Sequence, residues 1–198
     1  MGGDKDKLRG TREFQPRDKS PEAMEEYFAA VEDPWGYKQN PDHVVRARHI
    51  RDILGNRRFG RLLDIGCAEG FITHLIKDLA DYRVGIDPSP TAIARAREVY
   101  GNEIDFEVGN ILDFRADEPF DLVTVTGVLY YVREKIDLAL ATLYAVLTPD
   151  GVLLLSHLKE SSGDGFLSVF DGNGYVLKTS REFTCNNNIH LMHVLAKD

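Results

Sequence analysis

The chain has 198 residues, of which 43% are hydrophobic and 28% are charged, and these values are typical of one globular domain with its own core. Lysine and arginine total 24 and aspartate and glutamate total 32, so the formal net charge is −8. This balance argues against a broad nucleic-acid-binding face, which would be basic, and no apolar run approaches the roughly 20 residues of a membrane span.

The N-terminal residues favour a tail rather than a targeting signal. Residues 1–20 carry six basic and four acidic side chains, with only three large apolar ones, so we expect a disordered tail. They contain no apolar stretch typical of a secretory signal. The two cysteines, Cys67 and Cys185, make no disulfide framework, and the expected location is therefore the cytoplasm.

Two helices are predicted before the first strand. Ser20-Pro21 is a helix-start signal for residues 21–31, and the segment 33–37, with the sequence DPWGY, ends that helix. Apolar residues spaced for one face predict a second helix over 42–54. We expect residues 21–57 to form a helical lid over the rest of the chain.

From residue 58 onward, strand and helix patterns alternate. The predicted strands cover 61–65, 83–86, 104–108, 122–125 and 152–156, and the predicted helices cover 71–79, 89–100 and 136–147. Such alternation indicates a mostly parallel sheet with helices on both faces. After a weak helix around 165–170, strand candidates at 175–183 and 189–196 are joined by a short loop, which indicates an antiparallel hairpin. Residues 58–198 are therefore predicted to form a Rossmann-like three-layer α/β/α sandwich whose seven-stranded, mostly parallel sheet ends in an antiparallel hairpin.

Candidate site residues follow the first two strands, because ligands of such sheets bind beyond the carboxyl ends of the strands. Asp64 ends the first strand, and Gly66 and Gly70 permit a tight turn and a close approach of a ligand. Asp87 ends the second strand, where a carboxylate can accept two ribose hydroxyls. A cationic ligand with a ribose fits the acidic pattern of Asp64 and Glu69, and S-adenosylmethionine (SAM) is such a ligand.

A nicotinamide-dependent oxidoreductase uses similar parts but is disfavoured. Counted from Gly66, the dinucleotide fingerprint requires a glycine at position 68 and a small residue at position 71. The chain has Ala68 and the bulky Phe71 there, and it offers no Tyr-x-x-x-Lys pair.

Five segments resemble, in order and spacing, the motifs of class I SAM-dependent methyltransferases. They are LLDIGCAEG (62–70), GIDPS (85–89), VGNILDF (108–114), FDLVTVTGVLYYV (120–132) and LTPDGVLLLS (147–156). The resemblance implies SAM as cofactor and S-adenosylhomocysteine as product. It assigns the methionine part to Asp64, Gly66, Cys67, Ala68 and Gly70, the ribose to Asp87 and Pro88, the adenine edge to Asn110 and Ile111, and the methyl side to residues 126–130, including Gly127.

A narrower resemblance concerns the NodS-like N-methyltransferases, which act on an amino sugar. Asp33-Pro34-Trp35, Asn40-Pro41 and the segment 128–131 carry it. His43 stands where an acidic residue is usual in that group, and Gly127 stands where a glutamate often precedes Val-Leu-Tyr-Tyr. The acceptor of this chain therefore differs if that glutamate handles the acceptor amine.

The acceptor side is predicted from position. Tyr130 and Tyr131 are expected to end the fourth strand, with one facing the cleft, and we favour Tyr130. His157 is expected to follow the fifth strand and is the candidate proton acceptor. Trp35, Tyr37, Tyr131 and His43 are the candidate lid and substrate residues, although Trp35 serves equally well as a packing anchor.

Several residues with reactive or charged side chains are expected to be structural. Cys67 is expected to fill space, at most one of His190 and His193 can face a site, and Arg95 is interpreted as part of a solvated helix face. No His or Cys cluster has metal-ligand spacing, so no metal is predicted.

The predicted function is methyl transfer from SAM to an amino or hydroxyl group of a small polar acceptor, such as a sugar-like metabolite or natural product. The alternative is a non-catalytic SAM-binding or partner-regulating module. The expected partner is a small molecule rather than a nucleic acid or a membrane, and the protein is expected to be a monomer or a homodimer.

Overall fold

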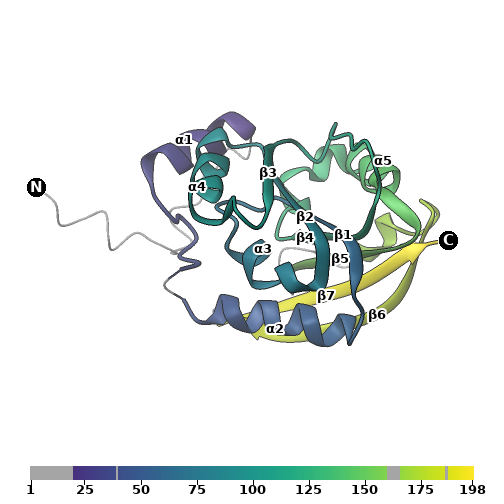
Figure 1. The fold of residues 1–198 in the computed structure, drawn as a ribbon. Coiled ribbons are helices and arrows are strands. Elements are labelled where there is room, and N and C mark those ends of the chain that lie inside the picture. The colour runs from purple at the N-terminus through teal and green to yellow at the C-terminus, as the bar shows by residue number, and fades with distance from the viewer. Residues whose placement is uncertain (1–19, 39, 160–165, 186) are drawn as a thin grey trace, which may run out of the picture.

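The computed structural model describes residues 20–38, 40–159, 166–185 and 187–198 of the chain. Residues 1–19 of the predicted tail and residue 165 of the predicted weak helix lie outside this description, and the 3-10 helix η5 (Phe166–Val169) represents the rest of that helix. Figure 1 shows a twisted sheet with helices on both faces. Within the described residues, no helix has both the length and the apolar character needed to span a membrane.

The sheet has seven strands in the order β3-β2-β1-β4-β5-β7-β6. In chain order they are β1 (Phe59–Ile65), β2 (Ala80–Asp87), β3 (Asp105–Val108), β4 (Phe120–Thr126), β5 (Leu147–Leu158), β6 (Tyr175–Cys185) and β7 (Asn188–Lys197). The first five strands run parallel, whereas β7 runs antiparallel to both β5 and β6. The predicted fold class is confirmed. The order in which strands are added reverses between the parallel neighbours β1 and β4, and such folds bind ligands at this switch point.

Serine caps start the helices that the sequence predicted from Ser-Pro pairs. Ser20 Oγ accepts the Ala23 N–H at 3.2 Å at the start of α1 (Pro21–Ala30). Ser89 Oγ accepts the Ala92 N–H at 3.0 Å at the start of α4 (Pro90–Tyr100). In both helices proline occupies the first turn, where its missing N–H costs nothing.

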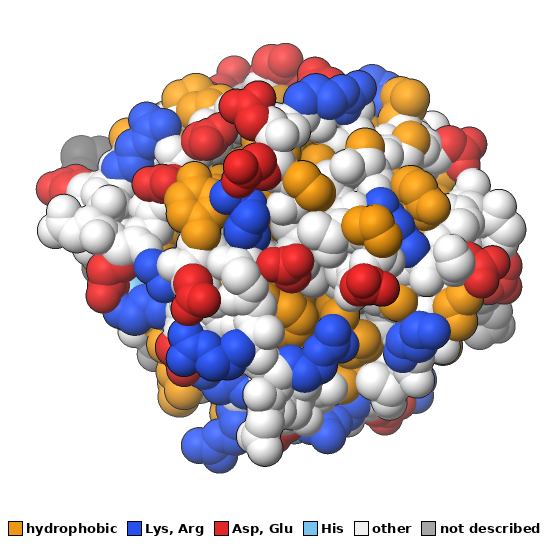
Figure 2. All heavy atoms as spheres, turned by 45° about the vertical axis from the view of Figure 1, so that its right-hand side comes forward, with side chains coloured by type: hydrophobic (Ala, Val, Ile, Leu, Met, Phe, Trp, Pro, Cys, Tyr) orange, Lys and Arg blue, Asp and Glu red, His pale blue; other side chains and the backbone are white. Residues whose placement is uncertain are grey.

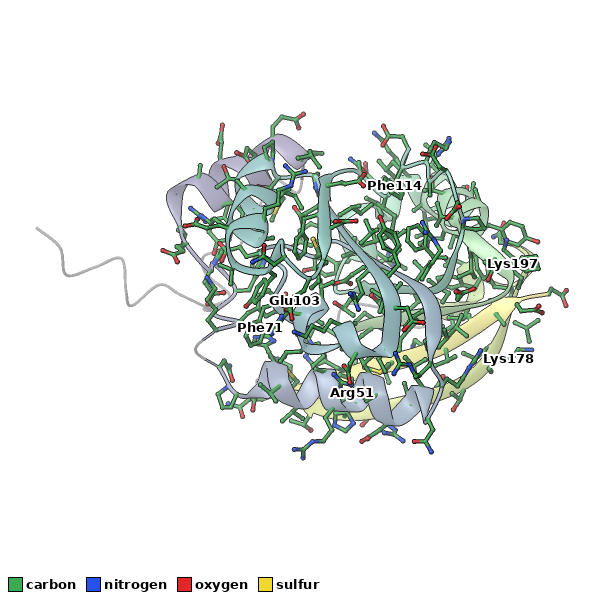
Figure 3. All side chains as sticks on the ribbon, viewed as in Figure 1. Arg51, Phe71, Glu103, Phe114, Lys178 and Lys197 are labelled. Atoms are coloured by element: carbon green, nitrogen blue, oxygen red, sulfur yellow. The ribbon has the colours of Figure 1, made fainter. Side chains whose placement is uncertain are left out.

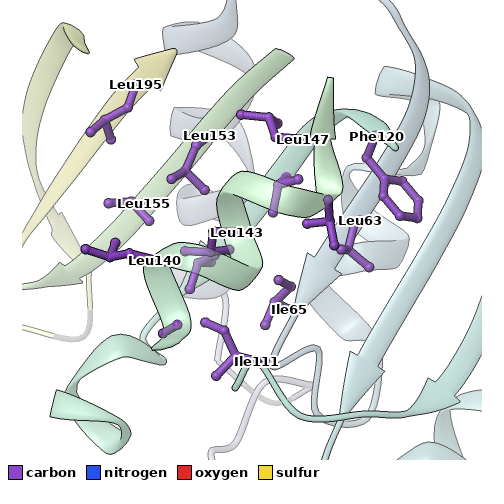
Figure 4. Close-up of a cluster of buried hydrophobic side chains, with 14 of the residues drawn as sticks. Leu63, Ile65, Ile111, Phe120, Leu140, Leu143, Leu147, Leu153, Leu155 and Leu195 are labelled. Atoms are coloured by element: carbon purple, nitrogen blue, oxygen red, sulfur yellow. The ribbon is translucent and has the colours of Figure 1, made fainter. Parts of the chain in front are cut away.

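Alternating strand residues face opposite helical layers. Leu63 and Ile65 of β1 point into a cluster with Leu143 of α5 (Ile136–Val146), shown in Figure 4. Leu62, which directly precedes Leu63, points to the other face, where α2 (Asp42–Leu54) and α3 (Phe71–Leu75) cover the sheet. The buried strands therefore have apolar residues on both faces.

Helix α2 belongs to the core of the sheet. Its buried Ile50 and Leu54 join a cluster with Phe183 of β6 and Met192 of β7, and Figure 1 shows α2 lying along the β6–β7 hairpin. Arg51, labelled in Figure 3, donates from α2 to the carbonyl of Leu75 and to both carboxylate oxygens of Asp78. The predicted lid therefore includes a helix fixed to the sheet.

Two boundaries differ from the sequence predictions. The predicted helix 71–79 divides into α3 and the 3-10 helix η2 (Lys77–Leu79), because the backbone of Ile76 leaves the helical region with φ −109° and ψ 7°. Residues 148–151, whose Thr-Pro-Asp-Gly sequence favours a turn between the predicted helix 136–147 and the predicted strand 152–156, lie inside β5. Leu147 pairs there with Phe120, and the regular register resumes at Val152. The extra residues of β5 are accommodated by an irregularity in its pairing with β4, between Phe120 and Leu122.

On the face drawn in Figure 2, lysine and arginine side chains are interspersed with aspartate and glutamate side chains. This face presents a mixture of both charges.

Candidate functional site

A cavity of about 1140 Å³ opens at the carboxyl ends of β1, β2, β4 and β5. Helix α1, the segment 34–37 and the start of α2 border it on one side, and residues 126–135 border it on the other. Residues 188 and 190, at the start of β7, close its far end. The cavity therefore lies where the sheet topology places a ligand site.

Seven of the ten predicted cofactor-binding residues line this cavity. They are Gly66, Ala68, Asp87, Pro88, Asn110, Ile111 and Gly127. The other three, Asp64, Cys67 and Gly70, lie behind the cavity wall. Asp64 is buried, and its two carboxylate oxygens accept the hydroxyls of Thr124 at 2.7 Å and Thr73 at 2.5 Å. Burial raises the pKa of Asp64 to about 6.

The turn after β1 is held against β2 by backbone hydrogen bonds. The N–H groups of Gly66 and Cys67 both donate to the Ile86 carbonyl, at 2.8 and 3.0 Å. Gly66 has φ +73°, and a Cβ added to it would come 2.2 Å from Cγ2 of Val128. Ala68, where glycine is usual in the motif, also lies in the left-handed region with φ +50°, at a cost of about 1–2 kcal/mol for a side-chain-bearing residue. The replacement is therefore accommodated with backbone strain.

Asp87 presents a fixed carboxylate to the cavity. Its two oxygens accept the backbone N–H groups of Ala68 and Ser89, each at 3.0 Å. Burial raises the pKa of Asp87 to about 6. Each oxygen keeps a lone pair beyond these bonds, so the carboxylate can accept further hydroxyls from a ligand.

Glu69 holds the segment between α1 and α2, a role that the sequence analysis did not predict. The buried Glu69 carboxylate accepts from Arg95 at 2.9 Å and from the Asp33 N–H at 3.0 Å, and Lys38 lies 3.5 Å away. Asp33 in turn accepts the N–H groups of Tyr37 and Lys38. The interpretation of Arg95 as part of a solvated face was wrong, because its guanidinium pairs with the buried Glu69 carboxylate on the turn after β1. Glu69 therefore acts as a clamp: its contacts hold the segment 33–38 against the turn after β1 and against α4.

All four predicted lid residues line the cavity. Trp35 also contacts the rings of Tyr27 and Phe28 of α1, with centroids 5.3 and 6.4 Å apart. The Tyr37 ring lies against His43, 4.3 Å between centroids, and burial raises the pKa of Tyr37 to about 12. Trp35 therefore serves as a packing anchor and as part of the wall.

Both Tyr130 and Tyr131 line the cavity, so the expectation that only one faces it was wrong. The fourth strand ends at Thr126, and the two tyrosines lie in the 3-10 helix η3 (Leu129–Tyr131), with ring centroids 4.2 Å apart. Strand alternation does not apply to residues in a 3-10 helix, which explains the error.

His157 lies within β5 rather than after it, and it lines the cavity. Its Nδ1 is 3.2 Å from the Leu158 carbonyl, and its Nε2 is 3.0 Å from Nε2 of His193. His193 Nδ1 is 2.7 Å from the Ser180 hydroxyl. Both ring nitrogens of His157 are therefore engaged within the protein, and His190, rather than His193, reaches the cavity.

Three residues that the sequence analysis did not select also line the far end: Arg46, Ser156 and Asn188. No spacing rule marks them, because they come from α2, β5 and β7 and meet only in the folded chain. Within the described part of the chain, no group of three or more His, Cys, Asp and Glu side chains is arranged to hold a metal ion.

The sheet order and the site define a class of fold. A search of solved structures finds the N-methyltransferase NodS from Bradyrhizobium japonicum WM9, in complex with S-adenosylhomocysteine, with a TM-score of 0.78 and 22% identity over 89% of this chain and 98% of that one. This likeness, together with the strand order, shows that the chain has the fold of SAM-dependent methyltransferases.

The family follows from the sequence comparisons. The family model described as Nodulation protein S (NodS) matches residues 19–169, so the chain belongs to the NodS family. Nodulation protein S of Bradyrhizobium diazoefficiens is 30% identical over 138 residues, which are 66% of this chain and 65% of that protein. A ubiquinone biosynthesis O-methyltransferase of Azorhizobium caulinodans is 30% identical over 165 residues, which are 74% of this chain and 64% of that protein. The chain thus spans slightly less than two thirds of these relatives.

Proposed function

We propose that the protein is an enzyme that transfers the methyl group of SAM to an amino or hydroxyl group of a small polar acceptor, such as a sugar-like metabolite or natural product. The observation that carries the proposal is the buried Asp87 carboxylate, fixed by two backbone N–H groups beside the Gly66 turn. Membership of the NodS family supports it.

The residues at this end of the cavity fit SAM. Asp87, with Pro88 beside it, would accept the two ribose hydroxyls, and the absence of a side chain at Gly66 leaves room for the methionine part. Asn110 and Ile111 would meet the adenine edge. The side-chain oxygen of Asn110 accepts the Leu112 N–H at 3.0 Å. The side-chain nitrogen of Asn110 therefore points away from Leu112 and can donate to a ligand.

The acceptor would enter the far end of the cavity. SAM supplies a methyl group that is already activated by the sulfonium, so the protein mainly aligns the acceptor and excludes water. Tyr130, Tyr131 and His157 line the cavity, and they would surround the acceptor together with Trp35 and Tyr37 from the lid side.

The chemistry of the acceptor can be tested at His157. Because both of its ring nitrogens are bonded within the protein, we expect His157 to orient the acceptor rather than to take its proton. An orienting role predicts that His157→Ala lowers kcat less than about tenfold. A loss of roughly 10²–10⁴-fold would instead identify His157 as a general base, which a hydroxyl acceptor needs more than an amine does. Unchanged turnover and acceptor affinity in both His157→Ala and Tyr130→Phe would place the acceptor elsewhere.

The deciding experiment for the whole proposal has two measurements. The first is calorimetry with S-adenosylhomocysteine, which tests the cofactor site. The second tests catalysis by measuring how much S-adenosylhomocysteine forms from SAM in the presence of a panel of amino sugars and natural-product alcohols. The comparisons leave the acceptor atom open, because one relative is named as an N-methyltransferase and another as an O-methyltransferase. Binding without product formation across a broad panel would favour a non-catalytic module.

A further inference from the structure

Arg46 lines the cavity from α2 and is only 8% exposed. One terminal guanidinium nitrogen lies 4.0 Å from the Cys185 sulfur, a weak contact, and the buried Nε has no hydrogen-bond partner. Across the described ranges of the chain, no carboxylate forms an ion pair with it. A buried guanidinium is normally paired and hydrogen-bonded, so this side chain is prepared for an anion that comes from outside the chain.

The neighbouring groups supply no negative charge at neutral pH. Burial and, secondarily, the Arg46 charge lower the pKa values of His43 and His190 to about 4, so both rings are neutral at pH 7. The same charge acts on the hydroxyls of Tyr37 and Tyr130, which burial keeps protonated. The nearest residue with a carboxylate on the same helix, Asp42, acts on His43 but makes no ion pair with Arg46.

Two buried charged residues among the described lining residues mark opposite ends of the cavity. Asp87, 6% exposed, ends β2 on the proposed cofactor side. Arg46 contacts Cys185 at the end of β6, and β1, β4, β5 and β7 separate β2 from that edge strand. The other charged lining residues, such as Arg133 and Glu134, are exposed at the mouth. The unpaired cation therefore faces the part of the cavity left for the acceptor.

We infer that Arg46 binds an anionic group of the methyl acceptor, namely a carboxylate, a sulfate ester or a phosphate monoester. This inference rests on the proposed methyltransferase function. The planar guanidinium can donate two parallel hydrogen bonds to such a group. The Ser156 hydroxyl, buried in the same cavity and without a partner in the described structure, can supply a further donor. The acceptor is thus anionic rather than a simple cationic amine.

Anion binding is tested first on the protein saturated with S-adenosylhomocysteine. We expect sodium sulfate to raise the melting temperature of this complex above that in sodium chloride of equal ionic strength. Arg46→Met should remove most of the difference and leave only the general stabilisation that sulfate gives a folded protein. Arg46→Lys should reduce the difference because the two-pronged geometry is lost. The control Arg48→Met, at an exposed arginine of the same helix that does not line the cavity, should keep it. No sulfate effect on the wild type, or an equal effect in Arg46→Met, overturns the inference, and the wild-type measurement needs no variant to fold.

A second arm excludes the cofactor's own carboxylate as the anion. S-adenosylhomocysteine carries a carboxylate, whereas 5′-methylthioadenosine lacks the amino-acid part. We expect Arg46→Met to bind both within threefold of the wild type. A loss of at least about tenfold for S-adenosylhomocysteine alone would assign Arg46 to the cofactor and overturn the inference.

Matched acceptors complete the test. Each neutral amino sugar or alcohol is compared with its uronate or sulfated counterpart, and the anionic member should show at least about tenfold higher kcat/KM in the wild type and no advantage in Arg46→Met. Preference for the neutral member overturns the inference. If S-adenosylhomocysteine does not bind the wild type at all, the methyltransferase proposal fails, whereas binding of S-adenosylhomocysteine with no sulfate effect on the complex overturns only the inference about Arg46.

Discussion

The two ends of the cavity are built in different ways. At the cofactor end, backbone groups satisfy the polar side chains: Asp87 accepts the N–H groups of Ala68 and Ser89, and Asn110 accepts that of Leu112. At the acceptor end, the polar side chains come from α2, η3, β5 and β7, and both Arg46 Nε and the Ser156 hydroxyl lack partners. At the first end the backbone fixes polar groups that keep spare capacity for a ligand, whereas at the second end two buried polar atoms have no partner in the described structure.

This difference separates the expected effects of mutation. Changes at the cofactor end disturb local turns, so they act on ligand affinity and on stability together. Changes at the acceptor end should act on which molecule is bound, because Arg46 and Ser156 have polar atoms there without a partner in the described structure. The predictions below test this contrast, beginning with the largest effect.

Gly66→Val should lower the affinity for S-adenosylhomocysteine more than about 100-fold. The added Cβ would lie 2.2 Å from Cγ2 of Val128, and valine is strained at φ +73°. The control is Gly55→Ala, at φ +65° and ψ −146° with nothing within 4 Å of the added Cβ, which should cost about 1–3 kcal/mol of stability and leave the affinity unchanged. Calorimetry and urea unfolding measure the two quantities, and retained affinity in Gly66→Val would mean that no ligand approaches this turn.

Asp87→Ala should lower the affinity for S-adenosylhomocysteine at least about tenfold, because charged hydrogen bonds contribute roughly 1.5–3 kcal/mol each. A suitable control is Asp121→Ala. The Asp121 carboxylate also accepts a backbone N–H, that of Arg61 at 2.9 Å, but Asp121 does not line the cavity. Calorimetry at pH 7.5 should show normal affinity in the control. Equal affinities of wild type and Asp87→Ala would refute the ribose assignment.

The same contrast explains what the sequence could predict. The proposed cofactor end consists of short segments, so glycines and a carboxylate at fixed spacing selected Gly66 and Asp87, which the structure places on the cavity wall. The directions of the strands, mostly parallel with an antiparallel hairpin at the end, followed from the alternation of patterns, whereas their order in the sheet came from the structure. The Ser-Pro pairs marked two helix starts because capping and the proline ring act within one turn.

The errors concern features that depend on tertiary contacts. Glu69 and Arg95 form an ion pair between a turn and a helix 26 residues apart, and no local pattern signals it. The pairing of Leu147 with Phe120 extended β5 through residues that favour a turn. Arg46 looked like any helical arginine, because its burial depends on the distant β6–β7 hairpin. An acceptor site assembled in this way cannot be derived from spacing.

Glu69→Gln should loosen the lid side of the cavity without touching the far end. The amide loses the charge that pairs with Arg95 and Lys38, and the buried contacts weaken by about 1–3 kcal/mol. Hydrogen exchange should accelerate in residues 33–38, and added S-adenosylhomocysteine should slow exchange across 21–45 in the wild type. Glu103→Gln, at an exposed pair with Lys77, is the control. Unchanged exchange in Glu69→Gln would contradict the clamp.

The smallest effect concerns pH and the buried histidines of the acceptor end. Burial, followed by the Arg46 charge, lowers the pKa of His190 to about 4, below its ordinary value near 6.5. The folded state therefore binds fewer protons than the unfolded state, and the stability linked to His190 is complete above pH 6.5 and is lost as the pH falls toward 4. Asp64 and Asp87, with pKa values raised to about 6, act in the opposite direction.

His190→Gln isolates this contribution, because the aspartate effect is common to both proteins and cancels in their difference. Urea unfolding at pH 7 should show the variant less stable than the wild type, since the glutamine fills the space beside Phe183 less well than the stacked ring does. Between pH 7 and pH 5 the gap should narrow, because only the wild type loses stability through protonation of this ring. A gap that stays constant over this range would mean that His190 keeps an ordinary pKa and that the far end of the cavity is wetter and less positive than the position of Arg46 implies.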